Sequence, residues 1–270
     1  MENTPVIEFD NVSYTYNRKT PFETRALQNI SFQILKGEIV AVCGSTGSGK
    51  TTLIKMINRL LVNTSGTIKV SGQVFDSKLN IKELRKKVGM IFQYPDHQIF
   101  ESSVKKELIY AGLKFGMHTK HALKKAKEAC DNYGFDFNKY KNRNPFELSG
   151  GEKRKVAICS ILAYEPEILI FDEPTAGLDN KGLIALKELI LKLNGQGKTI
   201  ILISHDADFI DEISHKIIVL KKAVTVYNGK TESFMKNYSK FEMEELGLEK
   251  PFRWIVEEKR KLQLSQRENL

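Results

Sequence analysis

Residues 44–52 read Gly44-Ser45-Thr46-Gly47-Ser48-Gly49-Lys50-Thr51-Thr52, and this stretch decides the fold. An apolar run, 39–43, precedes it, and an amphipathic run, 53–61, follows it. A buried strand, a glycine-rich turn and a helix are the context in which a G-x-x-x-x-G-K-S/T match predicts a phosphate-binding loop. The alternative is a glycine-rich turn that binds no ligand, and the complete motif in this context argues against it.

The residue types of this loop indicate its chemistry. Glycines allow successive backbone N–H groups to converge on phosphate oxygens, and the following helix adds its positive end. Lys50 is then expected against the β- and γ-phosphates, and the hydroxyl of Thr51 is expected to hold Mg²⁺. We therefore predict that the chain binds a nucleoside triphosphate.

The composition is typical of a soluble protein: 270 residues, of which 41% are hydrophobic and 28% charged. No apolar run approaches the roughly 18 residues of a membrane span, and the start shows no secretory signal. The three cysteines, Cys43, Cys130 and Cys159, lie far apart in apolar patterns, which favours a reducing cytoplasm over disulfides or a metal site. A net charge of +9 permits nucleic-acid or anionic-membrane partners, but the basic residues are spread along the chain. This spread favours a solvated surface, and we expect no nucleic-acid partner.

The pattern of apolar residues predicts a mixed α/β fold. Segments 6–9 and 30–34 alternate apolar and polar side chains, which predicts half-buried antiparallel strands. Continuous apolar runs at 88–92, 168–171 and 199–203 are typical of a parallel sheet that is covered on both faces. We expect a P-loop NTPase with a mostly parallel sheet core, an antiparallel β subdomain and an inserted helical subdomain.

The inserted helical subdomain is predicted at about residues 94–164, where no strand pattern occurs. Ser103 is expected to cap a helix that reaches residue 115 with Leu113 turned inward, and Thr119 is expected to cap the next helix. The last helix starts at Ser149 and ends before a proline.

Polar side chains follow the predicted parallel strands, at the edge where such sheets bind ligands. Asp172 suits the Mg²⁺ shell, and Glu173 points differently, toward a water that attacks the γ-phosphate. Gln93 and His205 can supply neutral hydrogen bonds to the metal, the water or the γ-phosphate. Tyr16 lies on a strand edge and is interpreted either as a core residue or as an adenine-stacking aromatic.

Beyond a predicted hairpin at 216–227, the chain loses core character. Residues 232–270 offer one weak amphipathic helix after Pro251, with Phe252, Ile255, Val256 and Leu262 on one side. We expect this C-terminal extension to be too small for a domain and to serve as a contact arm, with a dimer contact as one possible role.

Over about residues 6–230, the set of motifs resembles the nucleotide-binding subunit of an ABC transporter. The matching motifs are Walker A at 44–52, the Q-loop glutamine Gln93, the signature at 148–152, Walker B at 168–173, the D-loop at 176–179 and the switch histidine His205. The resemblance implies an ATP-binding domain at 1–231 that uses ATP and Mg²⁺, with Thr51, Gln93 and Asp172 toward the metal. It also implies that Tyr16 stacks on adenine.

The same resemblance implies a head-to-tail pair of ATPase subunits, in which Ser149 and Gly151 bind the γ-phosphate held by the partner's Walker A. This role is physically reasonable, because a helix that begins at Ser149 presents a hydroxyl, amides and its positive end to an anion.

Within this family, segments 90–100 and 174–182 are similar to the energy-coupling factor (ECF) ATPases, nearer the second of the paired A subunits. Glu152, where many relatives have Gln, and Tyr94, where ECF members more often have Asn, depart from the pattern. The resemblance implies a peripheral protein on the cytoplasmic face, usually in a heterodimer, that drives a transmembrane T subunit and substrate-binding S subunits. Residues from Gln93 to about 115 would form the groove for the T subunit.

Three other functions remain open. The first is the ATPase of another ABC importer or exporter, which co-purification of a permease pair would indicate. The second is a soluble ABC-type ATPase acting on ribosomes or DNA, which steeply salt-dependent nucleic-acid binding would indicate. The third is a non-hydrolysing switch, which predicts that Glu173→Gln leaves turnover unchanged. The transported substrate lies outside what this chain specifies.

Overall fold

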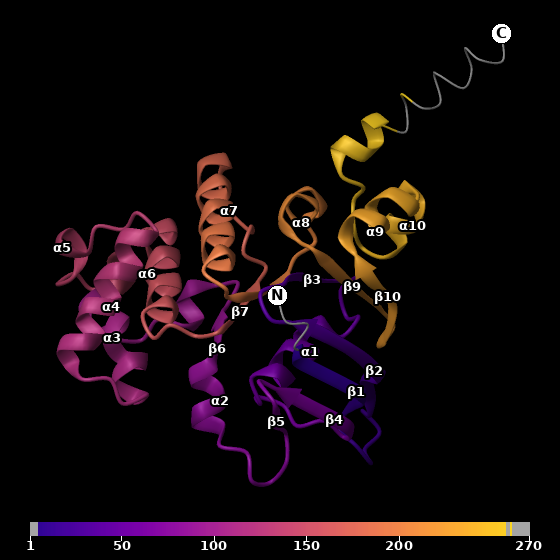
Figure 1. Cartoon of the computed structure of the whole chain (residues 1–270), viewed down its shortest axis with the longest axis horizontal. Coiled ribbons are helices and arrows are strands. Elements are labelled where there is room, and N and C mark those ends of the chain that lie inside the picture. The colour runs from indigo at the N-terminus through magenta and orange to yellow at the C-terminus, as the bar shows by residue number, and fades with distance from the viewer. Residues whose placement is uncertain (1–4, 258–259, 261–270) are drawn as a thin grey trace.

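The computed structural model describes residues 5–257 and residue 260, and the strands of this part form two sheets (Figure 1). The larger sheet has the order β10-β9-β3-β8-β7-β6. Its strands are β3 (Ile39–Cys43), β6 (Val88–Ile91), β7 (Ile168–Asp172), β8 (Thr199–Ile203), β9 (Lys216–Lys221) and β10 (Val224–Lys230). The smaller sheet is antiparallel and has the order β2-β1-β4-β5. Its strands are β1 (Pro5–Tyr16), β2 (Thr24–Leu35), β4 (Ser65–Val70) and β5 (Gln73–Val74).

The larger sheet is parallel from β9 to β6, and only β10 runs antiparallel, as the second strand of a hairpin with β9. All residues of β3, β6 and β8 are buried. Such continuous burial is expected when helices cover both faces of a parallel sheet. The predicted parallel core and antiparallel subdomain are therefore confirmed.

Helix α1 (Lys50–Ile57) packs between the two sheets. Its Leu53 and Ile54 share one hydrophobic cluster with Val42 of β3 and with Ile7 of β1. The opposite face of the larger sheet packs against α7 (Asn180–Gly195) and the helical subdomain. The remaining helices of this core are α2 (Ile81–Lys87) and α8 (Ala207–Ile213).

The helical subdomain projects to one side of the sheet, at the left of Figure 1. It contains α3 (Val104–Lys114), α4 (Thr119–Asn132), α5 (Phe137–Tyr140) and α6 (Gly150–Leu162), with 3-10 turns at Pro95–His97 and Pro145–Glu147. Its buried side chains belong to the same cluster as Leu169 and Phe171 of β7. The subdomain is therefore predicted correctly as an insertion that packs on the core.

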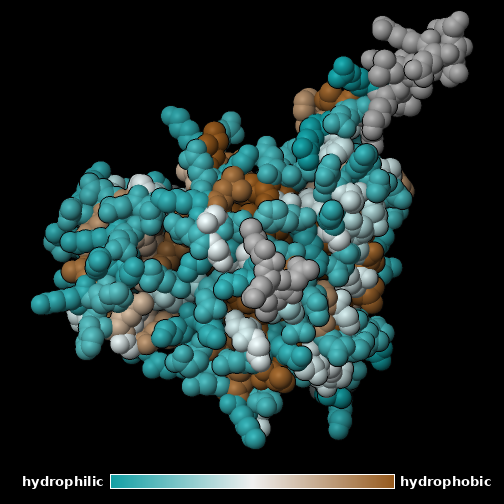
Figure 2. Space-filling model, in the orientation of Figure 1, coloured by the Kyte–Doolittle hydropathy of each residue, from teal (hydrophilic) through white to brown (hydrophobic). Residues whose placement is uncertain are grey.

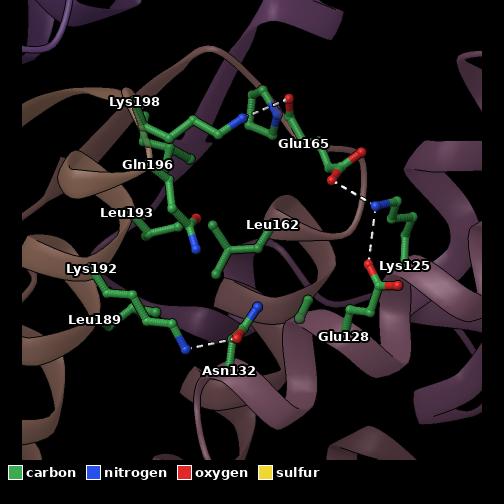
Figure 3. A pocket seen from close by; sticks show the side chains of 13 residues that line it. Lys125, Glu128, Asn132, Leu162, Glu165, Leu189, Lys192, Leu193, Gln196 and Lys198 are labelled. Atoms are coloured by element: carbon green, nitrogen blue, oxygen red, sulfur yellow. Dashed lines mark hydrogen bonds and ion pairs between the residues drawn. The ribbon is translucent and has the colours of Figure 1, made fainter.

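Polar contacts around a small pocket join this subdomain to the core (Figure 3). Lys125 of α4 bonds with Glu165, which lies in the link before β7, at 2.9 Å. Lys192 of α7 donates to the side chain of Asn132 at 2.8 Å, and Lys198 donates to the backbone oxygen of Glu165 at 3.2 Å. None of the predicted nucleotide-site residues lines the pocket. These contacts therefore hold the helical subdomain against the core.

Two local predictions in the helical subdomain are wrong. Leu113 is 39% exposed, because α3 turns Leu108, Ile109 and Gly112 toward the core instead. Thr119 is the first residue of α4 rather than its cap, and the capping position is His118, without a side-chain bond. The predicted cap at Ser103 is confirmed by a side-chain bond to the backbone N–H of Lys106. Ser149, predicted as the start of the last helix, is the residue that caps α6, and its side chain accepts from the N–H of Glu152.

The prediction that core character ends after the hairpin is also wrong. Helices α9 (Thr231–Asn237) and α10 (Lys240–Glu245) bury Phe234, Met235 and Met243 completely. After Pro251 the chain is helical at 252–257 and buries Trp254, whereas Phe252 is 71% and Val256 47% exposed. Leu262 lies outside the described residues, and the domain boundary at 231 stays a prediction.

The face of the molecule in Figure 2 is mostly hydrophilic, with hydrophobic surface in small patches. One patch lies over α7, whose Ile184 and Leu191 are exposed. In the described part of the chain, no helix is both long enough and apolar enough for a membrane span.

Candidate nucleotide site

The loop between β3 and α1 depends on glycines at two positions. Gly44 has φ +141° and Gly49 has φ +111°, and side chains rarely allow either value. A Cβ atom on Gly44 would lie 2.2 Å from the carbonyl oxygen of Leu220 in β9. On Gly49 it would lie 2.4 Å from the carbonyl oxygen of Ala26 in β2. The loop backbone is therefore packed tightly between strands of both sheets.

This loop gathers hydrogen-bond donors. The ammonium group of Lys50 donates to the carbonyl oxygens of Gly44 (2.6 Å) and Ser45 (3.1 Å), which holds the cation over the loop. Among the described residues, no side chain caps α1 at Gly49, so the first amides of the helix remain for an anion. The hydroxyl of Ser48 is buried and has no hydrogen-bond partner among the described residues. Such a donor set fits a polyphosphate.

The other predicted site residues lie at the same edge of the sheet as this loop. Strands β3, β8, β7 and β6 are parallel neighbours, so their carboxyl ends meet. These ends lead into Gly44, His205, the Asp172–Glu173 pair and Gln93. The expectation that the strand ends converge is confirmed.

The two carboxylates at the end of β7 lie in different environments. Burial raises the pKa of Asp172, and the neighbouring Glu173 raises it further, while Lys50 and Lys55 oppose the shift. Glu173 has a left-handed backbone with φ +47° and donates its N–H to Ile203 at 2.8 Å. Such strain in a non-glycine residue is found at functional sites. Because the backbone turns at Glu173, the adjacent carboxylates of Asp172 and Glu173 can take different roles.

Glu173 pairs with His205. Its carboxylate lies 2.9 Å from Nδ1 of His205. The Glu173 side chain is 16% exposed and that of His205 70% exposed. The pair therefore places a shielded carboxylate beside an imidazole that is exposed enough to contact a ligand.

Tyr16 lies beside α1. Its hydroxyl forms a 3.1 Å hydrogen bond with the hydroxyl of Thr52, and its ring meets Tyr14 edge-on at 4.7 Å. The residue is half-buried rather than part of the core, and Thr51 is exposed at the start of the helix. This placement agrees better with the adenine-side interpretation than with a core role.

Ser149 and Gly151 lie at the start of α6, in the helical subdomain. The N–H and hydroxyl of Ser149 both donate to Oε2 of Glu152 at 2.9 Å. Tyr140 donates to Oε1 of Glu152 at 2.6 Å, and these bonds lower the pKa of Glu152 to about 2. In the described chain, the side chain of Ser149 bonds with Glu152 and with no residue of 44–52.

The signature residues border a different hollow from the phosphate loop. Ser149 and Gly151 line it together with residues 177–179 of the D-loop. The structure therefore brings Tyr16, 44–52, Gln93, Asp172, Glu173 and His205 to one sheet edge. The side chain of Ser149 bonds with Glu152 instead, whereas Gly151 also lines a hollow together with Gln93 and Arg154.

Arg154 is a site residue that the sequence reasoning missed. From α6 it donates to the backbone oxygens of Gln93 (3.2 Å) and Ala176 (2.7 Å), which links the Q-loop, signature helix and D-loop. Burial lowers its pKa. In the sequence, Arg154 is marked only by its place in the signature helix. The neighbouring Lys153 and Lys155 are also basic, so the sequence does not distinguish Arg154 from them.

The oxygen atoms that could act as metal ligands near the loop are suitable for Mg²⁺. They are the hydroxyl of Thr51, the amide of Gln93 and the carboxylate of Asp172. Within the residues described, no cluster of three or more His, Cys, Asp or Glu side chains forms a metal site. A single carboxylate with neutral oxygens fits an ion that keeps waters and binds largely through nucleotide phosphates.

The fold and this edge of the sheet define the class of protein as a P-loop nucleoside triphosphatase. A family model described as ABC transporter matches residues 27–176. The chain is 41% identical over 247 residues to the energy-coupling factor transporter ATP-binding protein EcfA2 of Clostridium perfringens, covering 91% of this chain and 86% of that protein. It is 44% identical over 221 residues to the protein of that name from Spiroplasma kunkelii, covering 80% and 72%.

Solved structures agree with these sequence relatives. The structure of cbiO1 from Clostridium perfringens, part of the ABC transporter complex cbiONQ, has a TM-score of 0.77 and 30% identity over 86% of this chain and 91% of that one. The dimeric cassette MJ0796 bound to ADP and Pi has a TM-score of 0.74 and 29% identity over 83% and 98%. The chain therefore belongs to the ABC transporter family, among the ECF transporter ATP-binding proteins, and is an ATP-binding and ATP-hydrolysing protein.

Proposed function

We propose that this chain powers an ECF-type importer of vitamins or other micronutrients across the cell membrane. The observation that carries the proposal is the 41% identity, over 91% of the chain, to a protein named as an ECF transporter ATP-binding protein. The site supplies matching chemistry, because a phosphate loop, a metal-side carboxylate and a base-imidazole pair meet at one sheet edge. The protein would work at the cytoplasmic face, bound to the membrane through its partners.

In this function, residues 44–52 bind the triphosphate through backbone N–H groups, and Lys50 neutralises the β- and γ-phosphates. The hydrogen bonds of Lys50 to the loop carbonyls are ones that phosphate oxygens can replace. Tyr16 stacks on the adenine, and its bond to Thr52 fixes the ring relative to the phosphate loop.

Thr51, Gln93 and Asp172 would hold Mg²⁺, which supplies charge neutralisation to the phosphates when it is bound. Asp172 is near enough to Lys50 for the lysine charge to lower its pKa, which supports a carboxylate on the phosphate side of the sheet edge. Gln93 is tied to the signature helix by Arg154. Nucleotide binding and the position of the helical subdomain are therefore connected through one arginine.

Glu173 is the proposed general base for the attacking water. Its strained backbone and its N–H bond to Ile203 fix the direction of the side chain. Nδ1 of His205 lies within hydrogen-bond distance of this carboxylate, which leaves Nε2 as the ring nitrogen that can face the γ-phosphate.

A second ATPase subunit would complete the site, more readily a different chain than an identical one. Ser149 and Gly151 lie apart from the phosphate loop of their own chain, which a head-to-tail arrangement explains. The similar cassette MJ0796 is described as a dimer after hydrolysis, with ADP and Pi bound. In such a pair, Ser149 and Gly151 contact the γ-phosphate that the partner's loop holds.

The membrane partner would bind at residues 93–115. Tyr94 and Phe100 are each 56% exposed there, and Leu113 is exposed on the following helix. The ring of Phe100 packs edge-on against the ring of Tyr110, with the centroids 4.7 Å apart, and the two rings form an aromatic surface. An apolar coupling helix of a transmembrane T subunit fits this surface, with small S subunits carrying the substrate specificity.

Co-purification in mild detergent tests this proposal. We expect one T subunit and small S proteins to accompany the chain, with Phe100→Asp abolishing their retention. Phe22→Asp is the matched control, since Phe22 is 77% exposed on the β1–β2 hairpin, away from the groove. Recovery of a permease pair would assign the chain to another ABC transporter, and steeply salt-dependent nucleic-acid binding would favour the soluble alternative.

A further inference from the structure

The C-terminal segment, defined here as residues 231–257, packs beneath the phosphate loop. Phe234 and Met243 are completely buried and share a hydrophobic cluster with Cys43 of β3. Cys43 is the last residue of the strand that leads into the loop. The segment therefore supports the strand from which the nucleotide-binding residues start.

A turn at the end of α10 touches the loop itself. Gly247 donates to Glu244 and Leu248 donates to Met243, both at 2.9 Å, which is the Schellman arrangement that ends a helix with a left-handed residue. Gly247 accordingly has φ +77°. A Cβ atom there would lie 2.7 Å from Cα and 2.9 Å from N of Ser45. Only glycine lets the two backbones approach this closely.

The same segment also holds α8, the helix that follows His205. The indole N–H of Trp254 donates to the carboxylate of Asp211 at 3.0 Å, and the N–H of Phe252 donates to that of Asp208 at 2.9 Å. The side chain of Asp211 is 2% exposed, so its hydrogen bonds are costly to lose. A hollow lined by His205, Gly247 and Glu249, among others, lies between the two contacts.

We propose that the C-terminal segment is a positioning element of the ATP site. The turn at Gly247 sets the backbone of Ser45, and with it the direction of the amides that receive phosphate. The contacts at Asp208 and Asp211 hold α8, and through it the position of His205 against Glu173. This role concerns the nucleotide site of a single chain and does not depend on any membrane partner.

Nucleotide affinity of the full chain tests the first contact. Gly247→Ala should raise the Kd for ATP about tenfold or more, because misplacing a binding group by a fraction of an ångström is costly. The matched control is Gly72→Ala, since Gly72 has φ +75° but nothing within 4 Å of its added Cβ. Both substitutions carry the same backbone strain, and only the first displaces Ser45. An equal Kd in the two variants, with both folded by thermal melting, would overturn the role of Gly247.

Steady-state hydrolysis by the paired assembly tests the second contact and does not depend on the folding of the Gly247 variant. Trp254→Phe keeps an aromatic ring in the cluster but removes the donor to Asp211, which Arg253 still contacts at 2.7 Å. We expect kcat to fall about threefold with KM for ATP unchanged, since His205 rather than the loop is displaced. Tyr227→Phe is the control, because it removes a hydroxyl bond to Lys230 near the same cluster without touching α8. An unchanged kcat, or a change in KM instead, contradicts the proposed positioning of His205.

Discussion

Two helix N-termini in this chain, those of α1 and α6, are built for anions in opposite ways. At α1 the capping residue is Gly49, with no side-chain bond and no acidic residue in the first turn, and Lys50 adds a positive charge. At α6 the hydroxyl of Ser149 accepts from the N–H of Glu152, and the carboxylate of Glu152 accepts from the N–H and the hydroxyl of Ser149. The helix dipole favours an anion at both ends, but at α6 the carboxylate of Glu152 already accepts from the Ser149 hydroxyl.

This difference indicates a division of labour between the two ends. The α1 end can bind a phosphate on its own, because no side chain of the described residues caps its first N–H groups. At the α6 end, a phosphate must replace Glu152 as acceptor of the Ser149 hydroxyl and must approach a carboxylate of like charge. We therefore expect the α6 end to bind phosphate only when a second subunit delivers it. The following predictions test this comparison.

The largest expected effect concerns the chemistry beside the α1 end. Glu173→Gln should lower ATP hydrolysis about a thousandfold, because the amide cannot accept the proton of the attacking water. ATP affinity should remain unchanged, since Glu173 does not belong to the phosphate loop. Turnover and Kd are both measured. Glu165→Gln is the matched control, because Glu165 also has a left-handed backbone, with φ +57°, but lies at the subdomain joint. Unaltered turnover in the Glu173 variant would falsify its role as base.

The next effect tests the α1 end as a phosphate site that works alone. Lys50→Ala should raise the Kd for ATP about a hundredfold, because the β- and γ-phosphates lose their charge-assisted partner. Equilibrium titration of the isolated chain measures this. Lys78→Ala, at an exposed loop lysine, controls for the lost net charge. If both variants bind ATP equally, the cation over the loop serves folding rather than the nucleotide.

Much of the fold could be predicted from the sequence, because the signals were local. A continuous apolar run ahead of 44–52 predicted β3, and similar runs predicted β7 and β8. The C-terminal segment escaped prediction because its helices are short and their buried residues follow no long period. Phe234 and Met243 are buried by contact with β3, about two hundred positions earlier, and such contacts leave no trace in a local pattern.

The site shows the same division between local and distant signals. Strand ends predicted the positions of Asp172 and His205, because carboxyl ends of parallel strands share an edge. The pairing of His205 with Glu173, and the reach of Arg154 to Gln93, depend on side-chain directions that spacing does not specify. The capping box of Ser149 and Glu152 joins residues three positions apart, whereas Tyr140, the further donor to Glu152, lies in α5 and no local pattern marks it.

A smaller effect sharpens the comparison at the α6 end. Ser149→Ala should lower hydrolysis in the paired assembly about tenfold and leave the Kd for ATP of the isolated chain unchanged. Ser103→Ala is the control, since Ser103 also caps a helix and its loss costs a similar ~1 kcal/mol of stability. A higher Kd in the isolated Ser149 variant would mean that this end already contributes to the site of its own chain.

The smallest effect tests the carboxylate that occupies the α6 end. The pKa of Glu152 is lowered from 4.5 to about 2, with the bond from Tyr140 as the largest cause and the bonds from Ser149 next. A lowered pKa means that Glu152 stabilises the fold above pH 4.5, and that this contribution is lost as the pH falls toward 2. Because the side chain of Glu152 is only half-buried, solvent screening limits this contribution to stability. Glu152→Gln should lower the melting temperature by about 1–3 °C at neutral pH, and the difference from wild type should shrink on acidification. Tyr140→Phe should produce part of the same loss, with the acid transition moved to higher pH. A difference that stays constant from neutral to acid pH would mean that the charge of Glu152 contributes nothing to the cap, and that the contrast between the two helix ends rests on Ser149 alone.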